Sequence, residues 1–167
     1  MGTRPATALL LPVAFAALFA KTPAQAGVWQ PSAGHVQAPI WPEGKVPDPL
    51  PDPKPESVGP PPGREWWPRA NDVSVPTMTV YPPTAPNTGA AMVVFPGGGY
   101  QFLAMDLEGT EACDWLVSRG ITCVLLKYRV PGSGPWWDSE HDRRVYPKVQ
   151  TALQDAQRTL GLVRLHG

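Results

Sequence analysis

The chain has 167 residues, of which 23 are proline, and its 14 Lys and Arg residues balance its 14 Asp and Glu residues. This length suffices for one domain. The balanced charge, with no cluster of Lys or Arg, argues against a nucleic-acid partner. Two cysteines cannot supply the four ligands of a structural zinc site, so no metal is expected.

Residues 1–26 have the pattern of a secretory signal peptide. Arg4 gives a small positive start, residues 6–20 form an apolar stretch, and Ala24-Gln25-Ala26 is a typical cleavage site. The apolar stretch is too short to span a membrane, and Pro12 interrupts it. The mature protein is therefore expected to be secreted or periplasmic, with no membrane partner after cleavage. A retained N-terminal helix is the alternative.

Residues 27–72 are expected to form a proline-rich arm or linker. The run from Val46 to Pro62 favours an extended or polyproline II conformation over helix or sheet. One interpretation is a disordered spacer between the leader and a domain. The other is an arm that wraps the domain and lines its site, with Trp66 and Trp67 as hydrophobic anchors or as a sugar-stacking surface.

The remaining residues, 73–167, contain the patterns of regular structure, beginning with strands. Residues 73–81 alternate loosely, as an edge strand does, and residues 82–89 predict a hairpin connection. Residues 92–95 are four apolar residues in a row, which predicts a central strand buried on both faces. A second fully buried strand is predicted at residues 121–126.

Two helices are predicted in the same part of the chain. One covers residues 107–119 and ends at Gly120, and the other covers residues 149–165. A strand, a glycine loop, a helix and a strand in this order predict a right-handed βαβ unit with parallel strands. Residues 129–142 are expected to form a loop. Its Trp136 and Trp137, with Tyr146, either stack on a sugar or pack against the sheet.

The strand at residues 92–95 runs into Pro96-Gly97-Gly98-Gly99-Tyr100. Three residues without side chains leave backbone N–H groups uncovered at the carboxyl end of a strand, where open α/β sheets bind ligands. Pairs of such N–H groups stabilise the oxyanion of acyl transfer. Phe102 stands where a dinucleotide-binding loop needs its third glycine, and no lysine completes a phosphate-binding loop. A purely structural tight turn is the alternative.

This loop resembles the H-G-G-G oxyanion loop of α/β-hydrolase esterases, with proline in place of histidine. The chain is similar to the secreted acetylxylan-esterase-like and prolyl-oligopeptidase-like branch in several blocks, in order along residues 40 to 165: Ile40-Trp41-Pro42-Glu43-Gly44, Met78-Thr79-Val80-Tyr81, Ala104-Met105-Asp106-Leu107-Glu108-Gly109, Leu125-Leu126-Lys127-Tyr128-Arg129 and Leu153-Gln154-Asp155-Ala156-Gln157-Arg158. The resemblance implies a partial α/β-hydrolase fold, with the N-terminal strands and first helices of a mostly parallel sheet.

The resemblance also assigns roles within the loop. Gly98 and Gly99 would present the oxyanion N–H groups, and Pro96, Gly97 and Tyr100 would support the loop. The catalytic serine of this family lies in G-x-S-x-G on a later strand-to-helix turn, and no serine of the chain has that setting. We therefore expect no catalytic residue in this chain, a domain truncated before the nucleophile, and almost no activity of the chain alone.

Other polar residues are expected to be structural. Asp106 and Glu108, two positions apart at a helix start, do not share a face, so they should stabilise the helix N-terminus and anchor the loop. Asp155 is expected to act structurally beside Arg158, its neighbour one turn along the helix. None of the three histidines has the family's position for a catalytic base: His35, His141 and His166.

Cys113 and Cys123 are expected to be two small buried apolar residues, although an exported chain allows a disulfide between them.

The function favoured by these patterns is a secreted carboxylic-ester hydrolase that acts on acetylated or otherwise acylated carbohydrate. It would use a Ser-His-Asp triad that this chain does not contain. The expected partner is a small-molecule or carbohydrate ester, and no cofactor is expected. Two alternatives remain, a non-catalytic secreted binding protein and a fragment of a prolyl-oligopeptidase-type peptidase.

Overall fold

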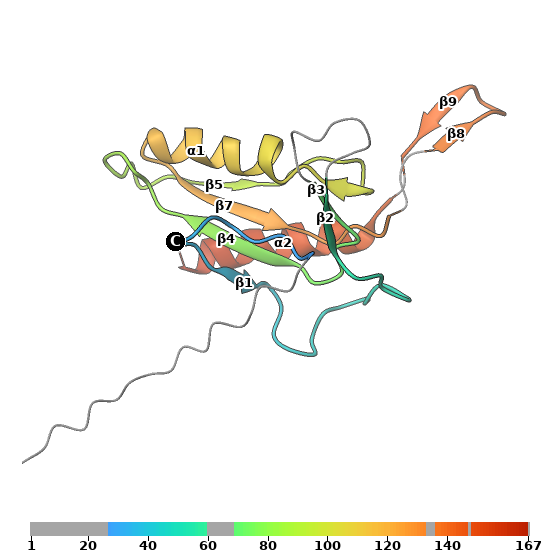
Figure 1. Ribbon diagram of the computed structural model, residues 1–167, viewed down its shortest axis with the longest axis horizontal. Helices are drawn as coiled ribbons and strands as arrows, with labels where there is room; N and C mark the ends of the chain where they lie inside the picture. Colours follow the sequence, from blue (N-terminus) through green and yellow to red (C-terminus); the bar gives the residue numbers. More distant parts are fainter. Residues whose placement is uncertain (1–26, 60–68, 133–135, 147, 167) are drawn as a thin grey trace, which may run out of the picture.

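The computed structural model of the protein describes residues 27–59, 69–132, 136–146 and 148–166 (Figure 1). A four-stranded sheet lies at its centre, in the order β1 (Gln37–Pro39), β4 (Thr77–Tyr81), β7 (Thr122–Lys127) and β5 (Ala91–Val94). The predicted signal peptide and the pair Trp66-Trp67 lie outside the described residues.

The fold is mixed α/β, with small and mostly antiparallel sheets. β4 pairs antiparallel with both β1 and β7, and β5 with β7 is the one parallel pair among the described strands. The prediction of a mostly parallel sheet is therefore wrong for these residues. Parallel neighbours need a long crossover connection, and residues 95–121 supply it for β5 and β7.

The predicted position of β5 is also wrong. β7 lies between β4 and β5, so residues 82–89 cross over β7 and do not form a hairpin connection. β5 pairs on one side only within the described residues, and Met92 and Phe95 remain 50% and 42% exposed. An uninterrupted apolar run predicts burial on both faces, but burial also depends on which strand lies next to it.

The βαβ unit is confirmed. A π-helical turn, η1 (Asp106–Thr110), leads into α1 (Glu111–Ser118), which packs against β7. Gly120 ends this helix with φ +78°, and a Cβ at this position would collide with the Pro86 carbonyl oxygen. β7 is buried along nearly its whole length, as expected.

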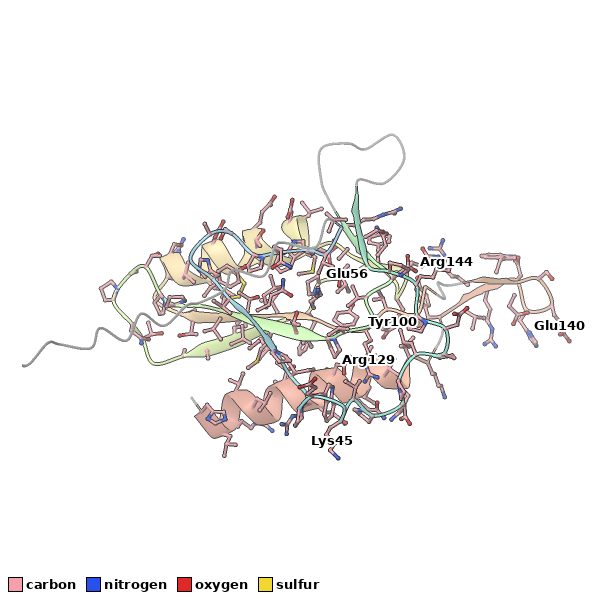
Figure 2. The ribbon with its side chains drawn as sticks, turned by 60° about the horizontal axis from the view of Figure 1, so that its bottom comes forward. Lys45, Glu56, Tyr100, Arg129, Glu140 and Arg144 are labelled. Atoms are coloured by element: carbon pink, nitrogen blue, oxygen red, sulfur yellow. A yellow bond between two sulfur atoms is a disulfide. The ribbon has the colours of Figure 1, made fainter. Side chains whose placement is uncertain are left out.

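A second helix, α2 (Gln150–His166), covers the other face of the sheet, and Figure 2 shows the sheet between α1 and α2. Its position matches the helix predicted at residues 149–165 within one residue at each end. No helix in the described ranges combines the length and apolar character needed to cross a bilayer.

A disulfide joins Cys113 of α1 to Cys123 of β7, and both residues are fully buried. The expectation of two separate apolar cysteines is therefore wrong. Sequence reasoning placed them correctly, one in a helix and one in a strand, but the packing of α1 on β7 is what brings the two sulfur atoms together. A bond of this kind typically stabilises a protein by about 2–4 kcal/mol.

The proline-rich arm, defined here as residues 27–59, wraps the domain, so the spacer interpretation is wrong for these residues. Trp29 and Ile40 are buried in the core. β1 extends the central sheet, and β2 (Ser57–Gly59) forms a second sheet with β3 (Arg69–Asn71) and β6 (Phe102–Leu103). Each proline fixes its own φ at about −65°, which favours extended stretches, and positive φ angles at Asp48 and Asp52 turn the arm between them.

A buried ion pair connects the arm, β7 and α2. Arg129 and Asp155 have fully buried side chains, with 2.8 Å between Nη2 and Oδ1. The structural role expected of Asp155 is confirmed, but its partner is Arg129 and not Arg158. Arg158 donates instead to the Ile40 carbonyl in the arm, at 2.9 Å.

The predicted loop at residues 129–142 contains one strand, β8 (Trp136–Asp138). It pairs with β9 (Arg143–Val145), just beyond the loop, in an antiparallel hairpin that projects from the rest of the molecule (Figure 1). Trp137 is 61% exposed and Tyr146 is 59% exposed. Neither side chain therefore packs against the sheet, and their use in sugar stacking stays a prediction.

Candidate functional site

The glycine loop, defined as residues 96–100, begins where β5 ends. Gly98 has φ +142° and Gly99 has φ +60°, and Tyr100 follows with φ +62°. A Cβ at Gly98 would collide with the Phe102 carbonyl oxygen, so only glycine fits there. The loop therefore has positive φ at three successive residues, and the third of them, Tyr100, is not a glycine.

Four hydrogen bonds fix the loop, two of them through side chains. The Gly97 N–H donates to Glu108 Oε2 at 2.9 Å, and the Tyr128 hydroxyl donates to the Pro96 carbonyl at 2.6 Å. Backbone N–H groups of Gln101 and Ala104 donate to the Gly98 and Gly97 carbonyls, at 3.1 and 3.0 Å respectively. The anchoring role expected of Glu108 is thus confirmed, whereas the contribution of Tyr128 had no signal in the sequence pattern.

The N–H groups of Gly98 and Gly99 form no hydrogen bond within the described residues. Such uncommitted donors, at the carboxyl end of a strand and in a loop fixed at both ends, have the character of an anion-binding site. The assignment of Gly98 and Gly99 as oxyanion donors, with Pro96, Gly97 and Tyr100 in support, stays a prediction.

An aromatic hollow of about 160 Å³ lies beside the glycine loop. It is lined by Phe95, Tyr100 and Tyr128 together with Ala152 and Ala156 of α2. Figure 2 shows Tyr100 and Arg129 at the same end of the sheet, where β5 and β7 both end. Burial and, to a smaller extent, the nearby Tyr100 and Glu108 together raise the pKa of Tyr128 to about 12. The hydroxyl that holds Pro96 therefore stays protonated at physiological pH.

Strongly alkaline pH is expected to destabilise the fold through Tyr81 and Tyr128. The pKa of each is raised by burial to about 12, above the ordinary 10.0. The unfolded chain releases these protons first, so their contribution to stability is complete below about pH 10 and is lost as the pH rises towards 12. Denaturant unfolding over this pH range measures how steeply the free energy of unfolding falls with pH. Tyr128→Phe should flatten this dependence and the exposed Tyr146→Phe should not; equal slopes in both variants would contradict this explanation.

The histidines lie in three different places. His35 contacts Ser32 and the Tyr81 ring, His166 ends α2, and His141 lies at the tip of the β8–β9 hairpin. None of them shares a described hydrogen bond with the glycine loop. The structure thus brings no imidazole into the candidate site from the residues that it describes.

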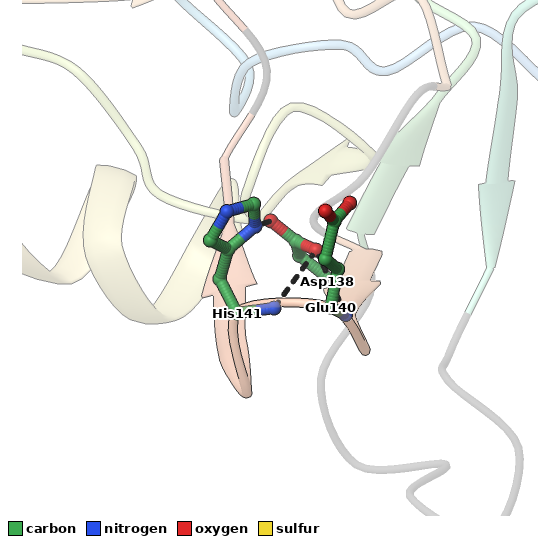
Figure 3. Close-up of side chains that lie close together, drawn as sticks. All are labelled: Asp138, Glu140 and His141. Atoms are coloured by element: carbon green, nitrogen blue, oxygen red, sulfur yellow. Dashed lines mark hydrogen bonds and ion pairs between the residues drawn. The ribbon is translucent and has the colours of Figure 1, made fainter.

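Figure 3 shows a cluster at the hairpin tip that sequence reasoning did not single out. One ligand atom from each of Asp138, Glu140 and His141 lies within 4.8 Å of the other two. His141 Nδ1 is 2.9 Å from Asp138 Oδ2, and Asp138 Oδ1 accepts the N–H groups of Glu140 and His141 at 3.2 and 3.3 Å. Two of the three residues are exposed, and hydrogen bonds within the turn account for the arrangement.

No protein-family model matches the chain. Over 54 residues it is 43% identical to an acetylxylan esterase of Xylanibacter ruminicola, an alignment that covers 32% of this chain and 11% of that protein. Among solved structures it resembles an acetyl ester-xyloside bifunctional hydrolase of Caldicellulosiruptor lactoaceticus, with a TM-score of 0.49 and 26% identity over 78% of this chain and 36% of the other. The chain therefore spans only a small part of either relative, and its similarity to the acetylxylan esterase is distant and partial.

Proposed function

We propose that these residues belong to a secreted carboxylic-ester hydrolase that acts on acetylated carbohydrate. The observation that carries the proposal is the glycine loop, whose Gly98 and Gly99 N–H groups are uncommitted while Glu108 and Tyr128 hold the loop in place. The 54-residue match supports the choice of an acetylated carbohydrate, because the matched protein is named an acetylxylan esterase.

In the proposed reaction, the carbonyl carbon of the ester is attacked by a serine that lies outside these 167 residues. The carbonyl oxygen of the ester becomes negative in the tetrahedral intermediate, and the two glycine N–H groups stabilise that charge until the intermediate collapses and releases the sugar hydroxyl. Donors in such a loop need no rearrangement at the moment of reaction, because backbone and side-chain hydrogen bonds already fix them.

Two further features support the proposal. The apolar and half-exposed side chains of β5 suit a sheet that continues with a further strand. The buried disulfide supports export, because disulfides persist in oxidising compartments.

The proposal is tested by comparing two proteins, the product of the whole reading frame that contains these residues and the 167-residue chain alone. The first is expected to release acetate from acetylated xylan, with inhibition by a serine-directed reagent, and the second is expected to be nearly inactive. Cleavage of proline-containing peptides without ester hydrolysis would replace the proposal with a peptidase. Serine-dependent turnover by the chain alone would disprove the outside nucleophile.

A further inference from the structure

A polar cleft of about 560 Å³ opens one residue beyond the glycine loop. Its walls are residues 50–54 of the arm, the end of β3 and the chain that follows β7. Gln101 lines the cleft, and its N–H donates to the Gly98 carbonyl of the glycine loop. A molecule in this cleft would therefore lie next to an ester held by the loop. The volume is typical of small-molecule sites, which measure about 300–1,000 Å³.

The arm wall of the cleft is clamped at both ends by cations from the end of β7. Arg129 Nη1 donates to the Pro47 and Asp48 carbonyls at 2.6 and 3.1 Å. Lys127 Nζ contacts both carboxylate oxygens of Glu56 at 2.9 and 2.7 Å, with both side chains more than nine-tenths buried. The clamps therefore hold the backbone of residues 49–55 in place while leaving the side chains between them exposed.

The polar side chains in the cleft are largely unused by the protein itself. Seven of them line it: Asp52, Lys54, Ser57, Arg69, Asn71, Asp72 and Gln101. Within the described residues only Asn71 makes side-chain hydrogen bonds, to the Ser57 and Arg69 carbonyls. Arg69 stacks on the Phe102 ring at 4.7 Å, and its buried Nε has no hydrogen-bond partner among the described residues.

The charge and chemistry of the lining select a class of ligand. Two carboxylates and two cations cancel, so the cleft has no net preference for an anion or a cation. Carboxylate, amide and guanidinium groups together supply both acceptors and donors, which is what a neutral molecule with many hydroxyl groups requires.

We propose that this cleft binds the sugar residues that carry the ester, as a site for a neutral oligosaccharide beside the glycine loop. The inference rests on the proposed function for its substrate class and deepens it by placing the carbohydrate. It also gives the proline-rich arm a role, because the arm supplies one wall and is fixed for that purpose by Lys127 and Arg129.

The test is a calorimetric titration of the protein with unacetylated xylohexaose, which measures the heat of binding. Saturable binding is expected, and the double variant Lys54→Ala with Gln101→Ala is expected to weaken it at least tenfold. Neither of these side chains makes a hydrogen bond within the described residues, so the variant should keep its fold. The matched control is Lys45→Ala with Gln157→Ala; Lys45 is exposed on the arm outside the cleft (Figure 2), and Gln157 is exposed on α2.

Because xylohexaose carries no ester, its binding is measured independently of acetate release. Binding that the double variant loses and the control keeps supports the cleft, whatever the hydrolysis assay gives. No saturable binding, or equal binding by the double variant, overturns the cleft even where the whole protein releases acetate. Tighter binding of a charged oligogalacturonide than of xylohexaose would likewise overturn the assignment to a neutral ligand.

Discussion

Replacing Asp155 by alanine is expected to lower the free energy of unfolding by about 3–5 kcal/mol, because it leaves a buried guanidinium without its counter-charge. Asp155 Oδ2 accepts the Nε–H and the backbone N–H of Arg129 at 2.9 and 3.0 Å. Its Oδ1 accepts Nη2–H of Arg129 and Nε1–H of Trp41, both at 2.8 Å. One side chain thus joins the arm, the end of β7 and α2, and whole domains are stable by only about 5–15 kcal/mol.

Denaturant unfolding of Arg129→Met, of Asp155→Leu and of the double variant measures how strongly the two side chains are coupled. Arg129→Met with Asp155→Leu should be less destabilised than the sum of the single changes, by about 1–3 kcal/mol, since neither ion is then left alone. Gln157→Ala, an exposed change on the same helix, should alter stability by no more than about 0.5 kcal/mol. Additive losses for Arg129 and Asp155 would show that the two side chains are not coupled.

A second large effect is expected at the glycine loop. In the whole protein, Gly98→Ala should lower kcat by about 10²–10³-fold, the usual cost of losing one oxyanion donor. The added methyl group would collide with the Phe102 carbonyl oxygen, and φ +142° is a backbone angle that alanine does not adopt without strain. The loop must therefore shift, and the N–H groups of Gly98 and Gly99 move with it.

The matched control is Gly89→Ala. Gly89 also has a positive φ, +77°, but a Cβ there meets nothing within 4 Å and lies away from the loop. It should cost about 1–2 kcal/mol of stability and leave kcat unchanged. A folded Gly98→Ala variant with the original kcat would contradict the oxyanion role.

A gentler variant keeps this test informative if Gly98→Ala fails to fold. Glu108→Ala removes the acceptor of the Gly97 N–H from an exposed position, so the fold should tolerate it. It should reduce kcat more than it raises KM, because it loosens the donors and does not touch the substrate. Glu111→Ala, an exposed carboxylate one turn later, is its control and should change neither constant.

The local features of the chain were predictable from its residues. Residues 121–126 contain only β-branched or apolar side chains, and the buried strand β7 covers all of them but Ile121. Gly120 supplies the left-handed residue that ends α1, and the three glycines supply the turn after β5. In each of these cases a short run of side chains has few conformations available, so the sequence pattern is sufficient.

Features that depend on distant partners were not predictable in this way. The burial of β5 depends on which strand lies beside it, and the disulfide depends on how α1 packs against β7. The proline-rich composition of the arm is equally compatible with a spacer and with a wrapped segment. Its position is decided by Lys127 and Arg129, which lie more than 70 residues further along the chain.

The same distinction, between local features and features that depend on distant partners, applies to the candidate site. A glycine loop after a strand could be predicted from the residues alone, because proline and three glycines permit little else after an apolar run. The contacts by which Glu108 and Tyr128 hold this loop, and by which Arg129 joins Asp155, follow from the folded structure. That structure also places the arm along a polar cleft beside the loop. Hydrogen bonds and ion pairs between residues far apart in sequence need the folded chain to bring their atoms within about 3 Å, and no local pattern records that distance.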